Sequence, residues 1–331
     1  MAGALAYDFA RPRREPAPTP LLVALCVDRF LVTEDERLIA DDGGDSTEAA
    51  PLDLPPSRGA GLPPGPLRLA DWSSLTREQH RALVRRIQKH IAAGDIYQAN
   101  LSQRFRLPFD AGGLALYHAL RRVSPAPFSG YLRALGLEVV SASPERLLAV
   151  EAGVARTRPI AGTRPRAQEE AADRALAAEL LLSEKERAEH LMLVDLARND
   201  LGQVAEIGSV RVDELMAIEE YAQVRHIVSN VTARLADGRD AVDALAALFP
   251  GGTITGVPKR RCMEILDALE PVPRGFYTGA LFYLTPSGRL DANILIRSAV
   301  VTEGTATFHT GGGIVADSDA DRTRQGSPIL D

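Results

Sequence analysis

The sequence has few cysteines, no long apolar run and no basic leader segment. Its two cysteines, Cys26 and Cys262, are too few for a disulfide framework, so we expect two reduced thiols. A membrane-spanning helix needs about 18 consecutive apolar residues, and no run in the sequence is that long. The N-terminus lacks the basic and apolar regions of a signal peptide. We therefore expect a cytoplasmic protein that does not cross a membrane.

Lysine is also scarce. Only three of the 38 basic residues are lysines, namely Lys89, Lys185 and Lys259, and arginine keeps its proton too firmly to act as a base or nucleophile. A mechanism that needs a lysine therefore has three candidates. The net charge of −6 gives no reason to expect nucleic acid or an anionic membrane as a partner. With 45% hydrophobic and 25% charged residues, the composition is that of a globular protein.

The chain divides by composition into three parts. Residues 1–40 contain two short apolar runs, Leu21–Cys26 and Arg29–Thr33, and are interpreted as a remnant of an N-terminal sheet. Residues 41–66 are rich in Gly, Pro, Asp and Ser without apolar periodicity, which predicts a flexible linker. Residues 67–331 are then expected to form the main domain.

Helices are predicted from apolar periodicity and capping signals. Thr76 and Gln79 form a potential capping box, and the helix that follows is expected to end near Gly94. Further helices are expected over Ala167–Leu196, Ala241–Phe249 and Arg260–Leu269.

Strands are predicted between these helices. They cover Tyr131–Ser141, Arg146–Pro159 with a turn at Glu151–Gly153, and a C-terminal meander of three runs with turns at Pro286–Gly288 and Glu303–Gly304. Because helices and strands are segregated along the chain, the predicted class is α+β with largely antiparallel sheets.

Two kinds of charged residue could carry chemistry. Glu186 and Glu189 are three apart on a predicted helix and so share a face, where they could bind Mg²⁺ or simply meet solvent. Arg297 lies in an apolar strand and must be paired or face a cavity, where it could hold a ligand carboxylate with two hydrogen bonds.

Two glycine-rich turns, Pro250–Lys259 and Thr310–Gly313, could present backbone N–H groups to an anion or could be ordinary tight turns. Neither fits a nucleotide-binding fingerprint. The turn Pro159–Pro165 carries the hydroxyl of Thr163, and His226 in an apolar segment is either a core residue or a site residue. The residues alone indicate an anion-binding α+β enzyme with Mg²⁺ as a candidate cofactor.

Seven motifs occur in one order across the main domain. They are IYQANLSQRF (Ile96–Phe105), SASPERLL (Ser141–Leu148), RPIAGTRPR (Arg158–Arg166), EKERAEHLMLVDLARNDLG (Glu184–Gly202), HIVSN (His226–Asn230), PGGTITGVPK (Pro250–Lys259) and GGGIVADSD (Gly311–Asp319). Together they resemble the chorismate-utilising enzymes: aminodeoxychorismate synthase component I, anthranilate synthase component I, and isochorismate and salicylate synthases. The resemblance implies the fold of anthranilate synthase component I, with two largely antiparallel sheets packed face to face and helices outside.

The resemblance also implies roles for the acids. Glu186 and Glu189 match the helical ligands of Mg²⁺, and Glu145 matches the general acid that protonates the departing C4 hydroxyl of chorismate. A carboxyl can do this near neutral pH only if its pocket raises its pKa.

Other matching positions would bind the substrate. The clamp for a chorismate carboxylate matches Arg297, Tyr277 and the backbone amides of Gly311, Gly312 and Gly313. Residues lining the ring pocket match Gly162, Thr163 and Thr253, with His226 beside the reacting ring.

The nucleophile distinguishes the branches of the family. Isochorismate and salicylate synthases resemble one another in using a lysine to activate water at the position of Gln98, and glutamine cannot act as that base. Ammonia is therefore the expected nucleophile, delivered from glutamine by a glutamine amidotransferase subunit, component II.

Two aminating activities remain open. Ala161 replaces a lysine found in many aminodeoxychorismate synthases, and with HIVSN it favours anthranilate synthase component I of tryptophan synthesis, a lyase. The IYQANLSQ, PGGTITG, DANILIR and FHTGGGIV segments favour aminodeoxychorismate synthase component I. We predict the latter transferase, which converts chorismate and ammonia to 4-amino-4-deoxychorismate for 4-aminobenzoate and folate synthesis.

The sequence departs from the family pattern at its C-terminal end. Thr323 and Gly326 occupy the positions of two further glutamates that complete the Mg²⁺ site. Fewer carboxylates should weaken metal binding and lower or abolish activity, so a chorismate-binding pseudoenzyme is a third alternative. A region that usually precedes the part resembling residues 1–40 is mostly absent, which leaves no basis for predicting feedback inhibition.

Overall fold

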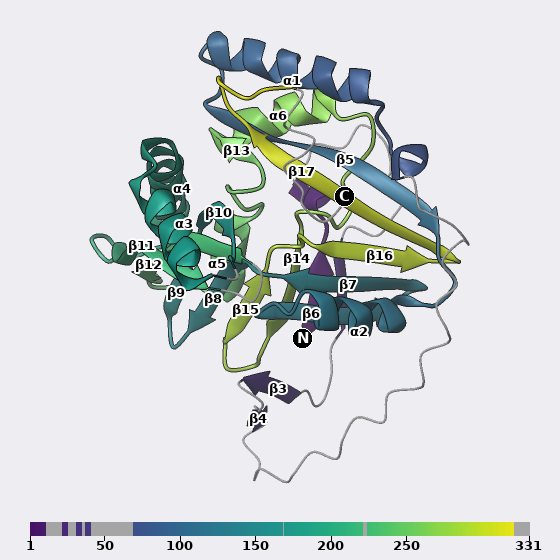
Figure 1. Cartoon of the computed structure of the whole chain (residues 1–331). Coiled ribbons are helices and arrows are strands. Elements are labelled where there is room, and N and C mark those ends of the chain that lie inside the picture. The colour runs from purple at the N-terminus through teal and green to yellow at the C-terminus, as the bar shows by residue number, and fades with distance from the viewer. Residues whose placement is uncertain are drawn as a thin grey trace.

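The computed structural model describes residues 1–10, 22–25, 31–34, 37–40, 69–167, 169–220 and 224–320. Two antiparallel sheets dominate this part of the chain, with helices outside them, which confirms the predicted α+β class (Figure 1). No helix in the described residues is long and apolar enough to cross a membrane.

The larger sheet has nine strands in the order β10–β12–β9–β8–β15–β14–β1–β2, and β11 pairs with β12. Its strands are β1 (Ala2–Leu5), β2 (Leu22–Leu25), β8 (Arg146–Glu151), β9 (Val154–Thr157), β10 (Ile160–Pro165), β11 (Arg211–Glu220), β12 (Val224–Arg234), β14 (Ala280–Leu284) and β15 (Leu290–Asn293). Because β1 pairs with β14, the first residues of the chain belong to the same sheet as residues near 280.

The smaller sheet has six strands in the order β13–β5–β17–β16–β7–β6. They are β5 (Gln98–Pro108), β6 (Phe128–Ala134), β7 (Leu137–Ser143), β13 (Gly256–Val257), β16 (Ser298–Thr302) and β17 (Thr305–Ile314). A separate hairpin pairs β3 (Leu31–Glu34) with β4 (Arg37–Ala40). Short 3₁₀ turns cover Tyr7–Ala10 and Leu69–Trp72.

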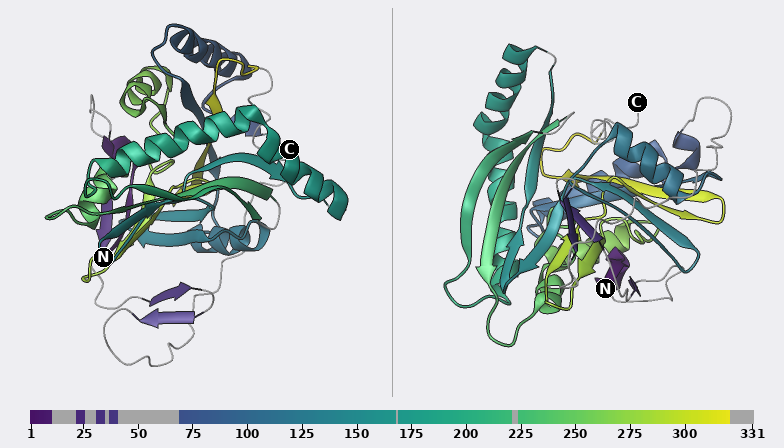
Figure 2. Two further views of the ribbon diagram at one scale, coloured as in Figure 1. Left: turned by 90° about the vertical axis from the view of Figure 1, so that its left-hand side faces the viewer. Right: turned by 90° about the horizontal axis from the view of Figure 1, so that it is seen from below.

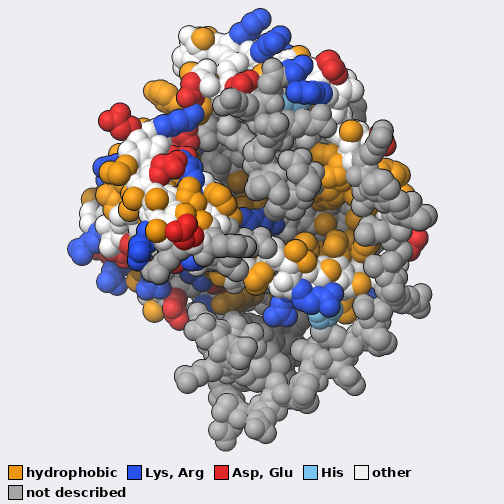
Figure 3. Space-filling view, in the orientation of Figure 1, with side chains coloured by type: hydrophobic (Ala, Val, Ile, Leu, Met, Phe, Trp, Pro, Cys, Tyr) orange, Lys and Arg blue, Asp and Glu red, His pale blue; other side chains and the backbone are white. Residues whose placement is uncertain are grey.

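Helix α1 (Arg77–Ala92) confirms the capping prediction. The hydroxyl of Thr76 accepts from the backbone N–H of Gln79, whose side chain accepts from the N–H of Thr76. Its buried face, with Val84 and Ile87, packs on β5 and on α6 (Lys259–Leu269). Lys and Arg side chains gather over the outer face of α1 at the top of Figure 3.

The helix predicted over 167–196 is in fact two helices, α3 (Glu170–Leu182) and α4 (Glu184–Gly202). The break is at Ser183, whose side chain accepts from the N–H of Glu186 and so begins a new helix. Helix α4 lies along β11 and β12 (Figure 2). Helix α5 (Ala241–Leu248) agrees with prediction, whereas α2 (Gly113–Val123), which packs on β7, was not expected.

Two strand predictions were wrong. The single strand over Tyr131–Ser141 is a hairpin of β6 and β7, because Leu135 and Gly136 both have positive φ and form a two-residue turn. The C-terminal meander is divided between the sheets: β14 and β15 join the larger one, while β16 and β17 join the smaller. The change of sheet occurs between Asn293 and Ser298, where the apolar residues Ile294–Ile296 continue the strand pattern and give no turn signal.

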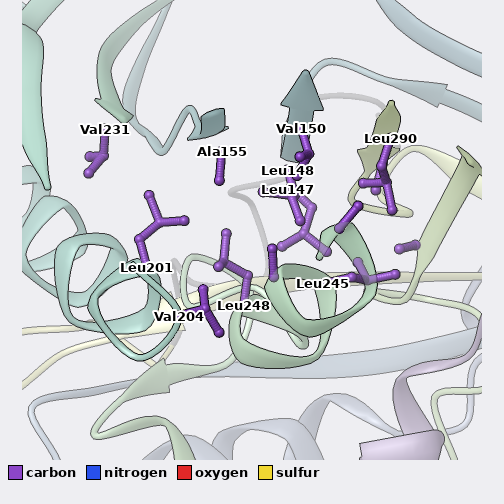
Figure 4. Packing of buried hydrophobic residues seen from close by; sticks show 14 of the residues in the cluster. Leu147, Leu148, Val150, Ala155, Leu201, Val204, Val231, Leu245, Leu248 and Leu290 are labelled. Carbon is purple, nitrogen blue, oxygen red and sulfur yellow. The ribbon is translucent and has the colours of Figure 1, made fainter. Parts of the chain in front are cut away.

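A buried apolar cluster fixes the larger sheet against α4 and α5. Leu148 and Val150 of β8 belong to one cluster with Leu201 of α4 and with Leu245 and Leu248 of α5 (Figure 4). Burying a side chain of this kind contributes about 1.5–3 kcal/mol, so the cluster stabilises the position of β8, which begins directly after Glu145. The proposed linker at 41–66 lies outside the described residues, and the domain boundaries stay a prediction.

Candidate active site

Glu145 lies where the chain passes from β7 to β8. Its side chain is buried, with 5% of the residue exposed, and accepts a hydrogen bond of 2.8 Å from the hydroxyl of Thr253. Burial raises the pKa of Glu145 to about 7, although Thr253 and the backbone N–H of Ile160 act in the opposite direction. A carboxyl with this pKa can hold a proton at neutral pH and donate it.

Thr253 belongs to the glycine-rich turn Pro250–Lys259, for which the sequence left anion binding and an ordinary tight turn open. Glu145, Thr253, Gly251 and Gly252 line one cavity together with Leu196 of α4. A Cβ on Gly252 would lie 2.2 Å from Cδ2 of Leu196, so only glycine lets this turn approach the helix so closely. The turn is therefore more than a reversal of the chain, because it brings the hydroxyl of Thr253 to the buried acid.

His226 and Thr163 face each other across β12 and β10. They are register partners, and Oγ1 of Thr163 lies 2.9 Å from Nδ1 of His226. Burial, and secondly the charge of Arg297, lower the pKa of His226, which favours the neutral ring at pH 7. Arg297 has φ +49° and lies where the chain passes between the two sheets. The structure thus brings Thr163, His226 and Arg297 together.

Glu186 and Glu189 approach this group from α4. Oε1 of Glu186 accepts from Nη1 of Arg164 at 3.1 Å, and a Cβ on Gly162 would lie 3.0 Å from Oε2 of Glu186. The pKa of Glu189 is raised, mainly by burial and then by the charge of Glu186. Two half-buried carboxylates that repel each other are a suitable pair for a divalent cation.

Mg²⁺ usually takes one or two protein carboxylates and completes its six ligands with water and substrate oxygens. The two carboxylates of Glu186 and Glu189 match this usual coordination of Mg²⁺. No group of three or more potential ligands occurs in the described ranges, and Thr323 and Gly326 lie outside them. Magnesium at this pair is therefore a proposal that depends on two acids.

Tyr277 lies against the glycines of β17. A Cβ on Gly311 would lie 2.8 Å from the hydroxyl of Tyr277, and one on Gly313 would lie 2.5 Å from Nε2 of Gln98. At Gly312, no atom of the described residues lies within 4 Å of a Cβ position. The glycine run therefore keeps its neighbours close to the backbone, as expected for amides that must approach a ligand.

Gln98 and Asn100 contribute two unusual acceptors. Both residues are buried, and in the described part of the chain Oε1 of Gln98 and Oδ1 of Asn100 have no hydrogen-bond partner. A buried acceptor without a hydrogen bond destabilises the fold unless a ligand or a water molecule donates a hydrogen bond to it. Asn100 was not among the predicted site residues, although its spacing from Gln98 puts both on one face of β5.

A buried ion pair supports this region and was not predicted either. Arg274, 1% exposed, donates to Glu270 at 2.7 Å, to the carbonyl of Asn100 at 2.6 Å and to that of Ile254 at 3.0 Å. It thereby joins β5 to the turn that carries Thr253. Single arginines before glycine are common, so no sequence signal marked it.

The three lysines are either paired with an acid or exposed. Lys259 donates to Asp200 at 2.6 Å and to the carbonyl of Leu248, while Lys185 pairs with Asp317 at 2.8 Å. Lys89 is exposed on α1. Ala161 of β10 is followed by a β-bulge at Gly162, which has φ +65°.

Comparison with known proteins shows which family the chain resembles. The family model described as chorismate binding enzyme matches residues 1–325. Anthranilate synthase component 1 of Pseudomonas aeruginosa is 51% identical over 246 residues, 74% of this chain and 50% of that protein. Aminodeoxychorismate synthase component 1 of Bacillus subtilis is 49% identical over 244 residues, 74% of this chain and 52% of that protein. The chain thus spans about half the length of these relatives.

Two solved structures have a similar fold. Anthranilate synthase component I from Streptococcus pneumoniae superposes with a TM-score of 0.82 and 29% identity, covering 99% of this chain and 78% of that one. The menaquinone-specific isochorismate synthase of Escherichia coli, at 20% identity, a TM-score of 0.70 and coverage of 83% and 61%, shares the fold. Family model, relatives and architecture coincide, and the chain belongs to the chorismate binding enzymes.

Proposed function

We propose that this chain aminates chorismate, with 4-amino-4-deoxychorismate as the product. The observation that carries the proposal is the buried Glu145–Thr253 pair, an acid with a pKa of about 7 placed to protonate a leaving hydroxyl. The relatives carry the names of two aminating enzymes, and that fact supports the reaction class without choosing between them.

We assign the binding of chorismate to the two groups of residues that would hold its carboxylates. One carboxylate of chorismate is held by Arg297, by the hydroxyl of Tyr277 and by the backbone amides of the Gly311–Gly313 run. Mg²⁺ at Glu186 and Glu189 would neutralise the other carboxylate when bound. His226, neutral and held by Thr163, lies beside the ring without adding a charge.

Ammonia fits the nucleophile position better than activated water. Gln98 is buried beside Gly313, and an amide cannot take a proton from water. The acceptor atoms of Gln98 and Asn100 can instead accept hydrogen bonds from ammonia. We assign the supply of ammonia to a glutamine amidotransferase subunit, in keeping with the component 1 names of the relatives.

The net reaction balances with one acid. A carbon–nitrogen bond forms at C4, the bond from C4 to its hydroxyl breaks, and Glu145 donates the proton that lets the hydroxyl leave as water. The amine then loses one proton, which restores Glu145 to its acid form.

Anthranilate synthase is the second candidate, and Ala161 is the observation that favours it. Without a lysine at that position the chain offers no amine for a covalent route to C4. Ammonia would then attack C2 while the C4 hydroxyl leaves, and loss of pyruvate would give anthranilate.

Product analysis tests these assignments. Purified protein is incubated with chorismate, Mg²⁺ and ammonium, with and without aminodeoxychorismate lyase, beside Glu145→Gln as the matched inactive variant. We expect 4-aminobenzoate only when the lyase is present. Fluorescent anthranilate without lyase would replace the proposal with the second candidate, and unchanged chorismate would leave a protein that at most binds it.

A further inference from the structure

Lys259 forms a buried ion pair that the proposed function does not use. Its side chain is 15% exposed, whereas that of Lys185 is 54% exposed. Nζ of Lys259 lies 2.6 Å from Oδ2 of Asp200, whose side chain is 10% exposed, and also donates to the carbonyl of Leu248 at 2.9 Å. Because desolvation offsets much of the attraction within a buried ion pair, stability alone does not account for this one.

The ammonium group of Lys259 joins the two ends of the turn that carries Thr253. Leu248 is the last residue of α5, and Lys259 is the first residue of α6. A cation suits the end of α5, where the carbonyl groups of the last turn lack partners within the helix. One side chain thus ties the end of α5 to the start of α6 and, through Asp200, ties both to α4.

The other anchors of this turn come after Thr253. Arg274 donates to the carbonyl of Ile254 at 3.0 Å, and the carbonyl of Thr255 accepts from a backbone N–H of β5 at 3.0 Å. Thr253 itself lies between these anchors and the end of α5. Its position therefore depends on how the end of α5 is held, and this is the end that Lys259 holds.

The partner of Lys259 also lines the cavity of the acid. In the described part of the chain, the charged residues that line this cavity besides Glu145 are Arg146 and Asp200. Arg146 pairs with Asp291 at 2.8 Å, as Asp200 does with Lys259. Burial raises the pKa of Asp200, and the charge and hydrogen bond of Lys259 act against it. Lys259 therefore balances a carboxylate that would otherwise add an unpaired negative charge to this cavity.

We propose that Lys259 is a positioning residue for the general acid: by joining the two ends of the turn, it holds the hydroxyl of Thr253 on Glu145. Lys259 acts through Thr253 rather than on the substrate. Its role in the reaction rests on the proposed function, whereas its effect on the titration of Glu145 can be measured without a substrate.

The neutral double variant Asp200→Asn/Lys259→Met tests this proposal. It removes the ammonium group without the unpaired buried carboxylate that Lys259→Met alone would leave, so we expect it to fold. The hydrogen bond from Thr253 lowers the pKa of Glu145, so its loss should raise that pKa, as it should in Thr253→Val. NMR of protein with isotope-labelled glutamate carboxyl groups measures the titration, and Glu145→Gln identifies the signal. The midpoint should move up by about 0.5 pH units or more in both variants.

Combining the variants separates positioning of Thr253 from a general loosening of the fold. If Lys259 acts through Thr253, adding Thr253→Val to the double variant should move the midpoint no further. Shifts that add would overturn the proposal, as would an unmoved midpoint in the double variant. Lys259→Arg keeps a charged donor and should titrate like the wild type. Lys89→Met, at an exposed position on α1, is the matched control for the loss of a lysine and should do so too.

The pH profile of chorismate turnover tests the role in the reaction. The alkaline limb of the profile should move to higher pH in the double variant, while the KM for chorismate should change by less than about twofold, because the carboxylate clamp is untouched. A limb that stays in place while the NMR midpoint moves would overturn this role. Absence of turnover in the wild type would instead contradict the proposed function, and the NMR result would stand apart from it.

Discussion

Thr253 donates its hydroxyl hydrogen to Oε1 of Glu145 at 2.8 Å, and both residues line a cavity that α4 also lines through Leu193 and Leu196. The two residues are 108 positions apart and are brought together by the glycine-rich turn after α5. The bond stabilises the carboxylate form, so it opposes the effect of burial on the pKa of Glu145. The acid is consequently balanced near neutrality by two competing causes.

The first prediction concerns the pH profile of turnover. Glu145 must be protonated to act, and its pKa of about 7 means that activity should fall as the pH rises through 7. Thr253→Val removes a hydrogen bond that lowers this pKa, so the alkaline limb of the rate profile should move to higher pH. Thr253→Ser keeps the hydroxyl and is the matched control. If the alkaline limb did not move in Thr253→Val, the limb would not report the ionisation of Glu145.

Glu145 should also weaken the fold at high pH. Its pKa is raised in the folded protein from about 4.5 to about 7, so its contribution is present below pH 4.5 and lost as the pH rises through 7. The cost above pH 7 is about 3 kcal/mol at most. Glu145→Gln should therefore be more stable than the wild type at pH 8.5, and this advantage should shrink at pH 5.

Urea unfolding at the two pH values measures this difference. Glu184→Gln, which changes an exposed acid in the first turn of α4, provides the comparison. Equal pH dependence in the wild type and Glu145→Gln would mean that Glu145 titrates normally.

A third prediction concerns magnesium. Mg²⁺ should raise the melting temperature of the wild type, because a ligand that binds only the folded state stabilises it by RT ln(1 + [L]/Kd). Glu189→Gln should remove most of this effect and, without metal, should melt higher than the wild type, since it no longer repels Glu186. Glu184→Gln should respond to Mg²⁺ like the wild type. A full Mg²⁺ response in Glu189→Gln would exclude the acid pair as the site.

The helices and the site differ in how far the sequence could predict them. Thr76 and Gln79 predict their helix because a capping box is local chemistry. Ser183 gave no visible break because the Ala, Leu, Glu, Lys and Arg residues on both sides of it are all good helix formers. Leu135 hid a hairpin turn, since leucine seldom adopts positive φ and so gives no turn signal.

The same contrast holds for the site. The resemblance named Glu145, Thr253, Thr163 and His226, and the structure places them in two contacting pairs. Arg274 could not be predicted, because its importance comes from burial against groups distant in sequence. Local patterns predict elements and candidate residues. The packing that leaves the acceptors of Gln98 and Asn100 without a partner among the described residues exists only in the folded chain.

The last prediction concerns Gly162, which sits at the bulge between Ala161 and Thr163 with φ +65°. A methyl group there would lie 2.8 Å from Cδ1 of Leu180 and 3.0 Å from Oε2 of Glu186. Gly162→Ala should therefore combine backbone strain of about 1–2 kcal/mol with displacement of Glu186 and a large loss of turnover.

Gly94→Ala separates the two effects. Gly94 has φ +76°, and no atom of the described residues lies within 4 Å of its Cβ position. It should thus lose stability through strain alone and keep both its turnover and its Mg²⁺ response. Urea unfolding and chorismate turnover are measured for both variants. Because both carry the same kind of backbone strain, any loss of activity found only in Gly162→Ala must come from the contact with Leu180 and Glu186. If both variants lost activity equally, the close approach of Gly162 to Glu186 would have no part in the reaction.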